Sequence, residues 1–119
     1  MREILFRGKT EKGEWVYGDL FKVFDDGSFI HDGKCHSVKV IPETIGQYTG
    51  LTDDNDNKIF EGDIVKCFSS DYIGNPKINL IKVEDMTDYN TMVYLNCSDR
   101  LVIIGNIHDN PELLGGEDK

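Results

Sequence analysis

The pattern of apolar and polar residues predicts a chain of short antiparallel strands. Glycine, Asp and Asn interrupt the sequence about every ten positions, and the intervening segments are rich in Val, Ile, Phe and Tyr. Apart from the C-terminal end, no segment shows a long helical period. The expected strands lie at 14–21, 28–31, 37–41, 78–83, 91–95 and 101–107, and on both sides of the polar loop at 53–57.

Two of these segments also suggest how the strands are arranged. The segment 91–95 is expected to pair with 78–83 across the intervening polar residues. The segment 101–107 is almost continuously apolar, which is typical of a strand that is covered on both faces. We therefore expect 101–107 to be the central strand.

The C-terminal end carries the signals of one helical turn. Asn110 is a good N-cap residue, Pro111 suits the first helical position, and Glu112 places an acid in the first turn. The glycine pair at 115–116 stops this turn at once. The last residues, 117–119, are expected to form a frayed acidic tail.

Length and charge narrow the class of protein. The chain has 119 residues, which predicts a single domain over 1–116, and 22 acidic against 13 basic residues give a net charge of -9. A duplex nucleic-acid binder needs clustered cations, so this charge argues against duplex binding. No apolar run approaches the ~20 residues of a membrane span, and charges interrupt the N-terminal apolar residues too early for a signal peptide. We expect no membrane contact and a cytoplasmic location.

The three cysteines, Cys35, Cys67 and Cys97, are expected to be reduced thiols. Their odd number and wide spacing fit neither a disulfide framework nor a CxxC zinc motif. The nearby His31 and His36 suggest a transition-metal cluster with Cys35, but adjacent residues of a strand point to opposite faces. Exposed strand-end histidines explain the pattern better, so no metal site is expected.

The loop at 53–57 resembles the beginning of a calcium-binding EF-hand loop. Asp53, Asn55 and Asn57 occupy its first, third and fifth positions. However, Lys58 stands where that loop needs glycine, and Ile64 replaces the bidentate acid. A solvated hairpin tip is therefore the expected structure.

Two pairs of residues are candidates for binding. Glu61 and Asp63 flank Gly62 and could be taken for an acid and a base, but a turn in which Asp63 accepts backbone N–H bonds explains them better. Trp15 and Tyr17 share one face of a strand, where they either form a ligand platform or pack. No catalytic residue is assigned. With neither a P-loop nor a dinucleotide fingerprint, no cofactor is expected.

Collinear sequence blocks resemble those of the phage and prophage YopX-like family. The resemblance implies a mostly β fold: a small SH3-like barrel with additional N-terminal β-hairpins and a short C-terminal helical turn. One departure is Asn55-Asp56, where the family carries the Asn-Gly pair of a type I′ hairpin turn. The blocks are FRGK at 6–9, GEWVYG at 13–18, GQYTGL at 46–51, IFEGDIV at 59–65 and IGNIHDNPELL at 104–114.

These observations predict a non-catalytic binding or assembly module. The alternatives are a nucleic-acid-binding module, which SH3-like barrels often are, and a small enzyme of unknown reaction. Open strand edges, including that of the Trp15/Tyr17 hairpin, favour a homo-oligomer. A continuous acidic surface would select a basic protein partner.

Overall fold

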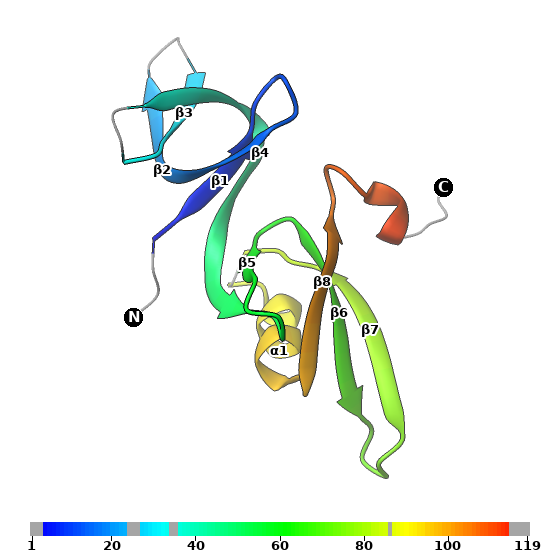
Figure 1. Cartoon of the computed structure of the whole chain (residues 1–119). Helices are drawn as coiled ribbons and strands as arrows, with labels where there is room; N and C mark the ends of the chain where they lie inside the picture. The colour runs from blue at the N-terminus through cyan, green and yellow to red at the C-terminus, as the bar shows by residue number, and fades with distance from the viewer. Residues whose placement is uncertain (1–3, 24–26, 34–35, 86, 115–119) are drawn as a thin grey trace. The chain divides into compact units, whose positions relative to one another are not determined.

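A computed structural model gives the fold of the chain (Figure 1). It describes residues 4–23, 27–33, 36–85 and 87–114. Packing divides the chain into two compact units, Met1–Tyr48 and Thr49–Lys119, which we call the N-terminal and C-terminal units. The single domain over 1–116 stays a prediction. The tail expected at 117–119 lies outside the described residues.

The N-terminal unit is a small closed barrel. Strands β1 (Phe6–Lys9), β2 (Trp15–Val23), β3 (Gly27–His31) and β4 (Ser37–Thr52) pair antiparallel in this order, and β1 also pairs with β4. The predicted fold class is therefore confirmed: the chain is mostly β, with a small barrel to which the N-terminal hairpin strands belong.

Because the barrel is closed, the Trp15/Tyr17 hairpin has no free strand edge. Strand β1 pairs with β4 and β2, and strand β2 pairs with β1 and β3. The predicted free edge at this hairpin is therefore wrong, because a closed barrel has no strand edge. Inside the barrel Ile30 and Val40 are buried, and a Cβ added at Gly8 would lie 3.0 Å from the Val40 side chain.

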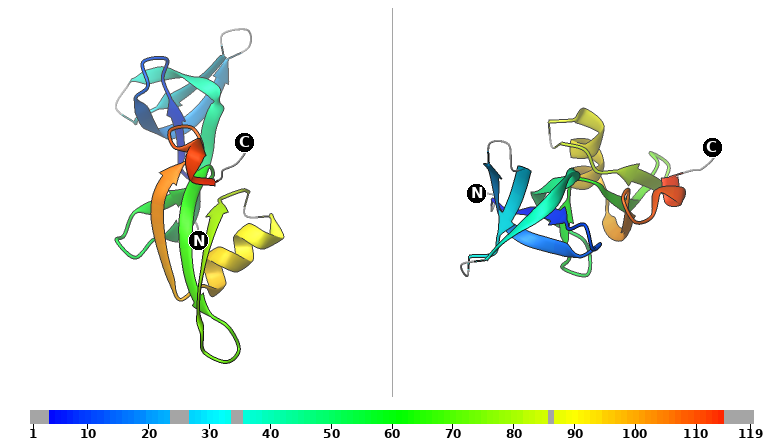
Figure 2. Two further views of the ribbon diagram at one scale, coloured as in Figure 1. Left: turned by 90° about the vertical axis from the view of Figure 1, so that its right-hand side faces the viewer. Right: turned by 90° about the horizontal axis from the view of Figure 1, so that it is seen from above.

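The C-terminal unit contains a three-stranded sheet, one helix and one helical turn (Figure 2). The sheet has the order β7-β6-β8, and the short β5 pairs with the end of β4. The helix α1 comes between β7 and β8 in the chain, and the 3-10 turn η1 follows β8. The elements are β5 (Lys58–Phe60), β6 (Asp63–Ser70), β7 (Pro76–Lys82), α1 (Tyr89–Cys97), β8 (Arg100–Asn106) and η1 (Pro111–Leu114).

The core of this unit lies between the sheet and α1. One face of the sheet contributes Val65 and Cys67 from β6 and Leu101 from β8, and α1 contributes Leu95. Ile59 of β5 and Val83, just after β7, complete the buried cluster. Among the described residues, no helix has the length and hydropathy needed to cross a membrane.

Two sequence predictions about this unit are wrong. The segment 91–95 is part of α1 and not a strand: the Asp88 carboxylate caps the helix by accepting a hydrogen bond from the Thr91 N–H at 3.0 Å. The central strand is β6 and not 101–107, which forms the edge strand β8. Ile104 on β8 is 37% exposed, so β8 is not covered on both faces.

The C-terminal helical turn is confirmed. It begins at Pro111, as a 3-10 turn, and the Leu113 N–H donates to the Asn110 carbonyl. A Cβ added at Gly105 of β8 would lie 2.9 Å from a Leu113 methyl group. The turn therefore packs on the sheet at the end of β8. The glycine pair expected to stop it lies outside the described residues.

Candidate interaction surface of the C-terminal sheet

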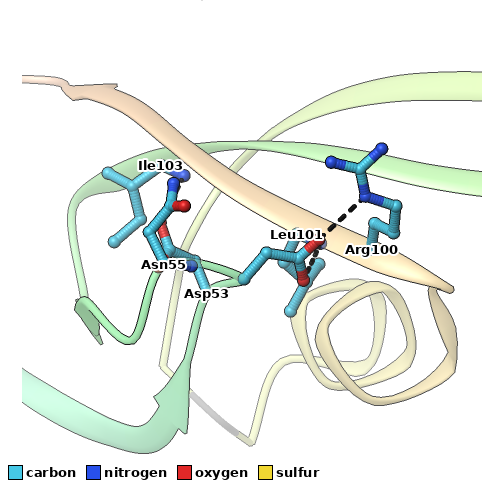
Figure 3. Close-up of polar contacts among 6 residues, drawn as sticks. Asp53, Asn55, Arg100, Leu101 and Ile103 are labelled. Atoms are coloured by element: carbon cyan, nitrogen blue, oxygen red, sulfur yellow. Dashed lines mark hydrogen bonds and ion pairs between the residues drawn. The ribbon is translucent and has the colours of Figure 1, made fainter.

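The outer edge of β8 is closed by two carboxylates and not by a strand. The Leu101 N–H donates to Asp54 Oδ1 at 3.3 Å, and the Ile103 N–H donates to Asp53 Oδ2 at 3.1 Å. The Asp54 N–H donates to the Leu101 carbonyl at 2.9 Å, and Arg100 Nε donates to Asp54 Oδ2 at 2.9 Å. Figure 3 shows this contact between the 53–57 loop and β8. The edge of β8 is thus satisfied within the chain.

The loop that supplies these carboxylates is a three-residue hairpin loop. The Asp53 N–H donates to the Asn57 carbonyl, and the Asp56 N–H donates to the Asp53 carbonyl. A type I′ turn needs a positive φ at both Asn55 and Asp56, whereas among the described non-glycine residues only Asp56 has one, at 65°. Asn55-Asp56 is therefore not a type I′ pair, and a turn followed by one left-handed residue takes its place.

The Asp53 side chain holds this loop together. Its Oδ1 accepts hydrogen bonds from the N–H groups of Asn55 and Asn57, both at 2.9 Å, and the residue is 5% exposed. Burial raises the pKa of this carboxyl, but the amides of Asn57, Ile103 and Asn55 together outweigh burial and hold the pKa below its usual value. The Arg100 side chain likewise lowers the pKa of Asp54. Asp53, the first residue of the EF-hand-like pattern, therefore uses its carboxylate to accept backbone hydrogen bonds.

The opposite edge of the sheet is formed by β7, which has β6 as its strand neighbour in the described part of the chain. Figure 1 shows β7 as the outermost strand of this sheet. Beyond its start, the hairpin tip carries Tyr72 and Ile73, which are 98% and 67% exposed. Within the described residues the two edges of one sheet therefore differ: that of β8 is capped and that of β7 is open.

One face of this sheet, which we call the outer face, points away from α1. Lys66 pairs with Leu80 on β7 and with Val102 on β8, so these side chains share this face. The next row consists of Ile78, Phe68 and Arg100. Ile78 is 57% exposed and Leu80 is 44% exposed.

Cations surround the aromatic ring of the outer face. Arg100 Cζ lies 5.1 Å and Lys66 Nζ lies 5.7 Å from the centroid of Phe68. Val102, opposite Lys66 on β8, adds a further apolar side chain to this face. The outer face therefore combines exposed apolar groups with positive charge, in a chain whose net charge is -9.

The candidate residues of the N-terminal unit form a cation–π cluster. Trp15 pairs with Lys9 and Tyr17 pairs with Arg7, so all four side chains share one face of the β1–β2 hairpin. Arg7 Cζ lies 4.6 Å and Lys9 Nζ lies 5.7 Å from the centroid of the Trp15 ring. Arg7 is buried, Trp15 is partly buried and Tyr17 is half-exposed. The predicted shared face exists, and the Trp15 ring packs against two cations on it.

Glu61 and Asp63 lie at the turn into β6, in the other unit. The Asp63 Oδ2 accepts a hydrogen bond from the Phe60 N–H at 2.7 Å, and Gly62 has a φ of 95°. Asp63 is buried, and Glu61 is partly exposed. The turn is built as expected from the sequence, with Asp63 in a structural position.

The histidines of the suspected metal cluster have local partners. His31 Nδ1 accepts a hydrogen bond from the Gly33 N–H at 3.0 Å, and His36 Nδ1 lies 3.4 Å from Asp32 Oδ2. Cys35 lies outside the described residues. Within the described ranges, no group of His, Cys, Asp or Glu side chains converges on a position for a metal ion.

Of the other cysteines, Cys67 and Cys97 are free thiols. Cys97 is exposed, whereas Cys67 is buried, and burial raises the pKa of the Cys67 thiol.

The outer face was missed in the sequence, although its alternation was visible. Ile78 and Leu80 alternate with Lys77 and Asn79, which is the signal of one apolar strand face. The sequence does not show that α1 covers the opposite face. A pairing partner is needed to tell the core face from the outer one.

The fold and this surface define a mostly β protein in which a closed barrel precedes a sheet with one open edge. The chain belongs to the YopX protein family, whose family model matches residues 5–115. The match spans both units and confirms the resemblance inferred from the sequence blocks. No curated protein matches the chain.

Proposed function

We propose that this YopX-family chain is a phage- or prophage-encoded binding or assembly module that catalyses no reaction and acts in the bacterial cytoplasm. Membership of the family supports the phage setting. The observation that carries the binding role is the outer face of the C-terminal sheet, where Ile78 and Leu80 are exposed opposite Phe68 and Lys66. Contiguous exposed apolar groups rimmed by polar residues mark interaction sites.

Charge indicates which partner fits this face. Lys66 and Arg100 lie beside Phe68, so an apolar protein segment that carries carboxylates is complementary to it. The basic protein partner predicted from the net charge of -9 would have to contact acidic surface elsewhere. We propose the apolar, acidic segment as the partner of the outer face.

The non-catalytic role is supported by the use of the carboxylates. The lowered pKa values of Asp53, Asp54 and Asp71 arise from hydrogen bonds that hold loops and a strand edge. A hollow in the C-terminal unit is lined by other residues, among them Glu84 and Asp88. Glu84 Oε2 lies 2.9 Å from Lys82 Nζ, and Asp88 caps α1. These acids are therefore accounted for by structure.

A second candidate is a single-stranded nucleic-acid binder, which one observation favours. An aromatic ring with cations on an open sheet face suits base stacking and phosphate contact, and Phe68 with Lys66 and Arg100 has this composition. The net charge opposes it, because the phosphate term of binding needs more cations than these.

Affinity purification with two matched variants tests the proposal. Lys66 lies on the outer face and Lys39 lies on β4 of the N-terminal unit, so Lys66→Glu and Lys39→Glu make the same charge reversal inside and outside the proposed site. Proteins that the tagged wild type captures from induced cells should still be captured by Lys39→Glu and should be lost with Lys66→Glu. Capture that is unaffected by Lys66→Glu would contradict the proposal, and a nuclease-sensitive capture would favour the nucleic-acid alternative.

A further inference from the structure

The open edge of β7 offers a defined set of backbone groups. The Val83 N–H donates to the Asp63 carbonyl at 2.8 Å, so the backbone groups of Val83 face β6. Successive residues of a strand direct these groups to alternate sides, so those of the odd-numbered residues of β7 face β6 as well. The N–H and C=O groups of Ile78, Leu80 and Lys82 therefore point to the open edge. At Pro76 the edge offers a carbonyl and no N–H.

We infer that two copies of this chain pair antiparallel through their β7 strands, with the two-fold axis at Asn79. In this register Ile78 faces Leu80 of the second copy, and the two residues exchange both backbone hydrogen bonds on each side of the axis. The Lys82 N–H of one copy reaches the Pro76 carbonyl of the other. The missing N–H of Pro76 thus leaves one bond unmade at each outer end of the ladder and none near the axis.

The side chains support the same register. Ile78 and Leu80 of both copies form one continuous apolar stripe on the outer face, and Lys77 lies opposite Ile81, so no like charges face each other directly. A shift by two residues in one direction places Ile78 opposite Lys82. A shift by two residues in the other direction places Leu80 opposite Pro76, which has no N–H to donate to the Leu80 carbonyl. A shift by one residue sets edge-facing groups against groups that face β6.

The contrast between the two edges supports the choice of β7. The edge of β8 is closed within the chain by Asp53 and Asp54, whereas the described residues place no other strand on β7. Unpaired edges form templates for pairing with another chain unless they are blocked. The inference rests on the assembly half of the proposed function and names a second copy of this chain as a partner.

Sedimentation of the purified protein tests the pairing. We expect a dimer at tens of micromolar, roughly the range of a moderate affinity. Leu80→Pro removes an edge-facing N–H and should weaken dimerisation by at least about tenfold, because symmetry removes the bond twice. The control Leu80→Ala keeps the N–H and should retain the dimer. A monomeric wild type, or a dimer that Leu80→Pro leaves intact, would overturn the inference.

Cross-linking tests the register independently of whether Leu80→Pro folds. Asn79→Cys, in a Cys67→Ala background that removes the native thiol paired with position 79, should oxidise to a disulfide between the two copies. Residues opposite each other in a pair without hydrogen bonds have Cα atoms about 4.5 Å apart, within disulfide reach. Lys77→Cys in the same background should not bridge to itself. A dimer without the 79–79 bridge contradicts this register.

Failure of this inference and failure of the proposed function give different results. Dimerisation is measured on the pure protein and needs no other partner. Lys66→Glu, on the central strand β6, should leave the dimer intact while it abolishes partner capture. A dimer without partner capture refutes the outer-face contact, and partner capture by a monomer refutes the β7 pairing.

Discussion

Two hairpin loops of the C-terminal unit have the same local structure and different surroundings. In the 53–57 loop the Asp53 side chain accepts from the second and fourth following N–H groups, and in the 71–75 loop Asp71 does the same, at 3.0 and 2.9 Å. Each loop has a left-handed residue in fourth place, Asp56 in one and Gly74 in the other. The first loop packs against β8, whereas the second carries the exposed Tyr72.

The barrel contains a third example, which shows that the pattern is local. In the 10–14 loop Thr10 Oγ1 accepts from the N–H groups of Lys12 and Glu14, both at 3.2 Å, and Gly13 has a φ of 87°. A short polar side chain at the first position and a left-handed fourth residue suffice for this loop. Local sequence therefore determines the geometry of the loop, whereas packing determines what the loop contacts.

Removing the first side chain of each loop should give the largest difference. Asp53→Ala leaves the N–H of Ile103 without its acceptor at a partly buried strand edge and also opens the loop. We expect it to lower the free energy of unfolding by about 2–4 kcal/mol. Asp71→Ala affects groups that water can reach and should cost about 1 kcal/mol or less. Urea denaturation measures both, and equal losses would show that packing adds nothing to the first loop.

Lowering the pH should also reduce the stability that Asp53 gives to the first loop, but by less than Asp53→Ala does. The folded-state pKa of Asp53 lies below the unfolded value of about 3.9, so its contribution to stability is complete above that value and is lost as the pH falls through the folded pKa. Protonation leaves one oxygen that still accepts, so the loss should be smaller than that of Asp53→Ala.

Urea midpoints from pH 6 to pH 3, roughly the range across the carboxyl pKa, test this expectation. Asp53→Asn should flatten the acid side of the stability profile, because the titrating group is gone. Asp71→Asn is the control. The hydrogen bond from the Asn75 amide is the main cause that lowers the pKa of the Asp71 carboxyl, but this carboxyl lies outside the core. A profile for Asp53→Asn that is as steep as that of the wild type would show that Asp53 does not carry the acid loss.

Exchanging the left-handed residues should have opposite effects in the two loops. Asp56 has a φ of 65° and Gly74 has a φ of 91°. Asp56→Gly should stabilise the fold by up to about 1 kcal/mol, and Gly74→Asp should destabilise it by a similar amount. No atom lies within 4 Å of the Cβ position at Gly74, so the cost there is one of backbone conformation. Destabilisation by Asp56→Gly of more than about 1 kcal/mol would mean that the Asp56 side chain has a further role.

The smallest effect is expected at the exposed loop. Tyr72→Ser should change the free energy of unfolding by no more than about 0.5 kcal/mol, because the side chain is 98% exposed. Chemical denaturation checks this value. A larger loss would show that Tyr72 packs against the protein in solution and that the 71–75 loop is not exposed.

Local signals predicted several features of this molecule correctly. The segment Asn110-Pro111-Glu112 placed the start of η1 at Pro111, because cap and proline preferences act within one turn. The role of Asp63 at the turn into β6 also followed from local chemistry. These features depend on neighbours in sequence, which a single chain shows directly.

The features that were missed depend on distant residues. Helix α1 buries Thr91 and Leu95, an i and i+4 pair, whereas its other positions give little apolar periodicity. The signal that could have found it was the N-cap Asp88. The central strand was predicted wrongly because β6 pairs with β8 across more than thirty positions, as between Lys66 and Val102. The alternation of Ile78 and Leu80 was visible, but this pairing is needed to tell the outer face from the core face.

The carboxylates that close the edge of β8 also determine what kind of assembly this sheet can build. A sheet with two open edges adds copies at both sides and grows into a fibre. With Asp53 and Asp54 bound to the N–H groups of Ile103 and Leu101, β8 cannot add a strand, so each copy has one place for a neighbour. Pairing through β7 therefore ends at two copies, and the same loop that stabilises the fold sets the stoichiometry.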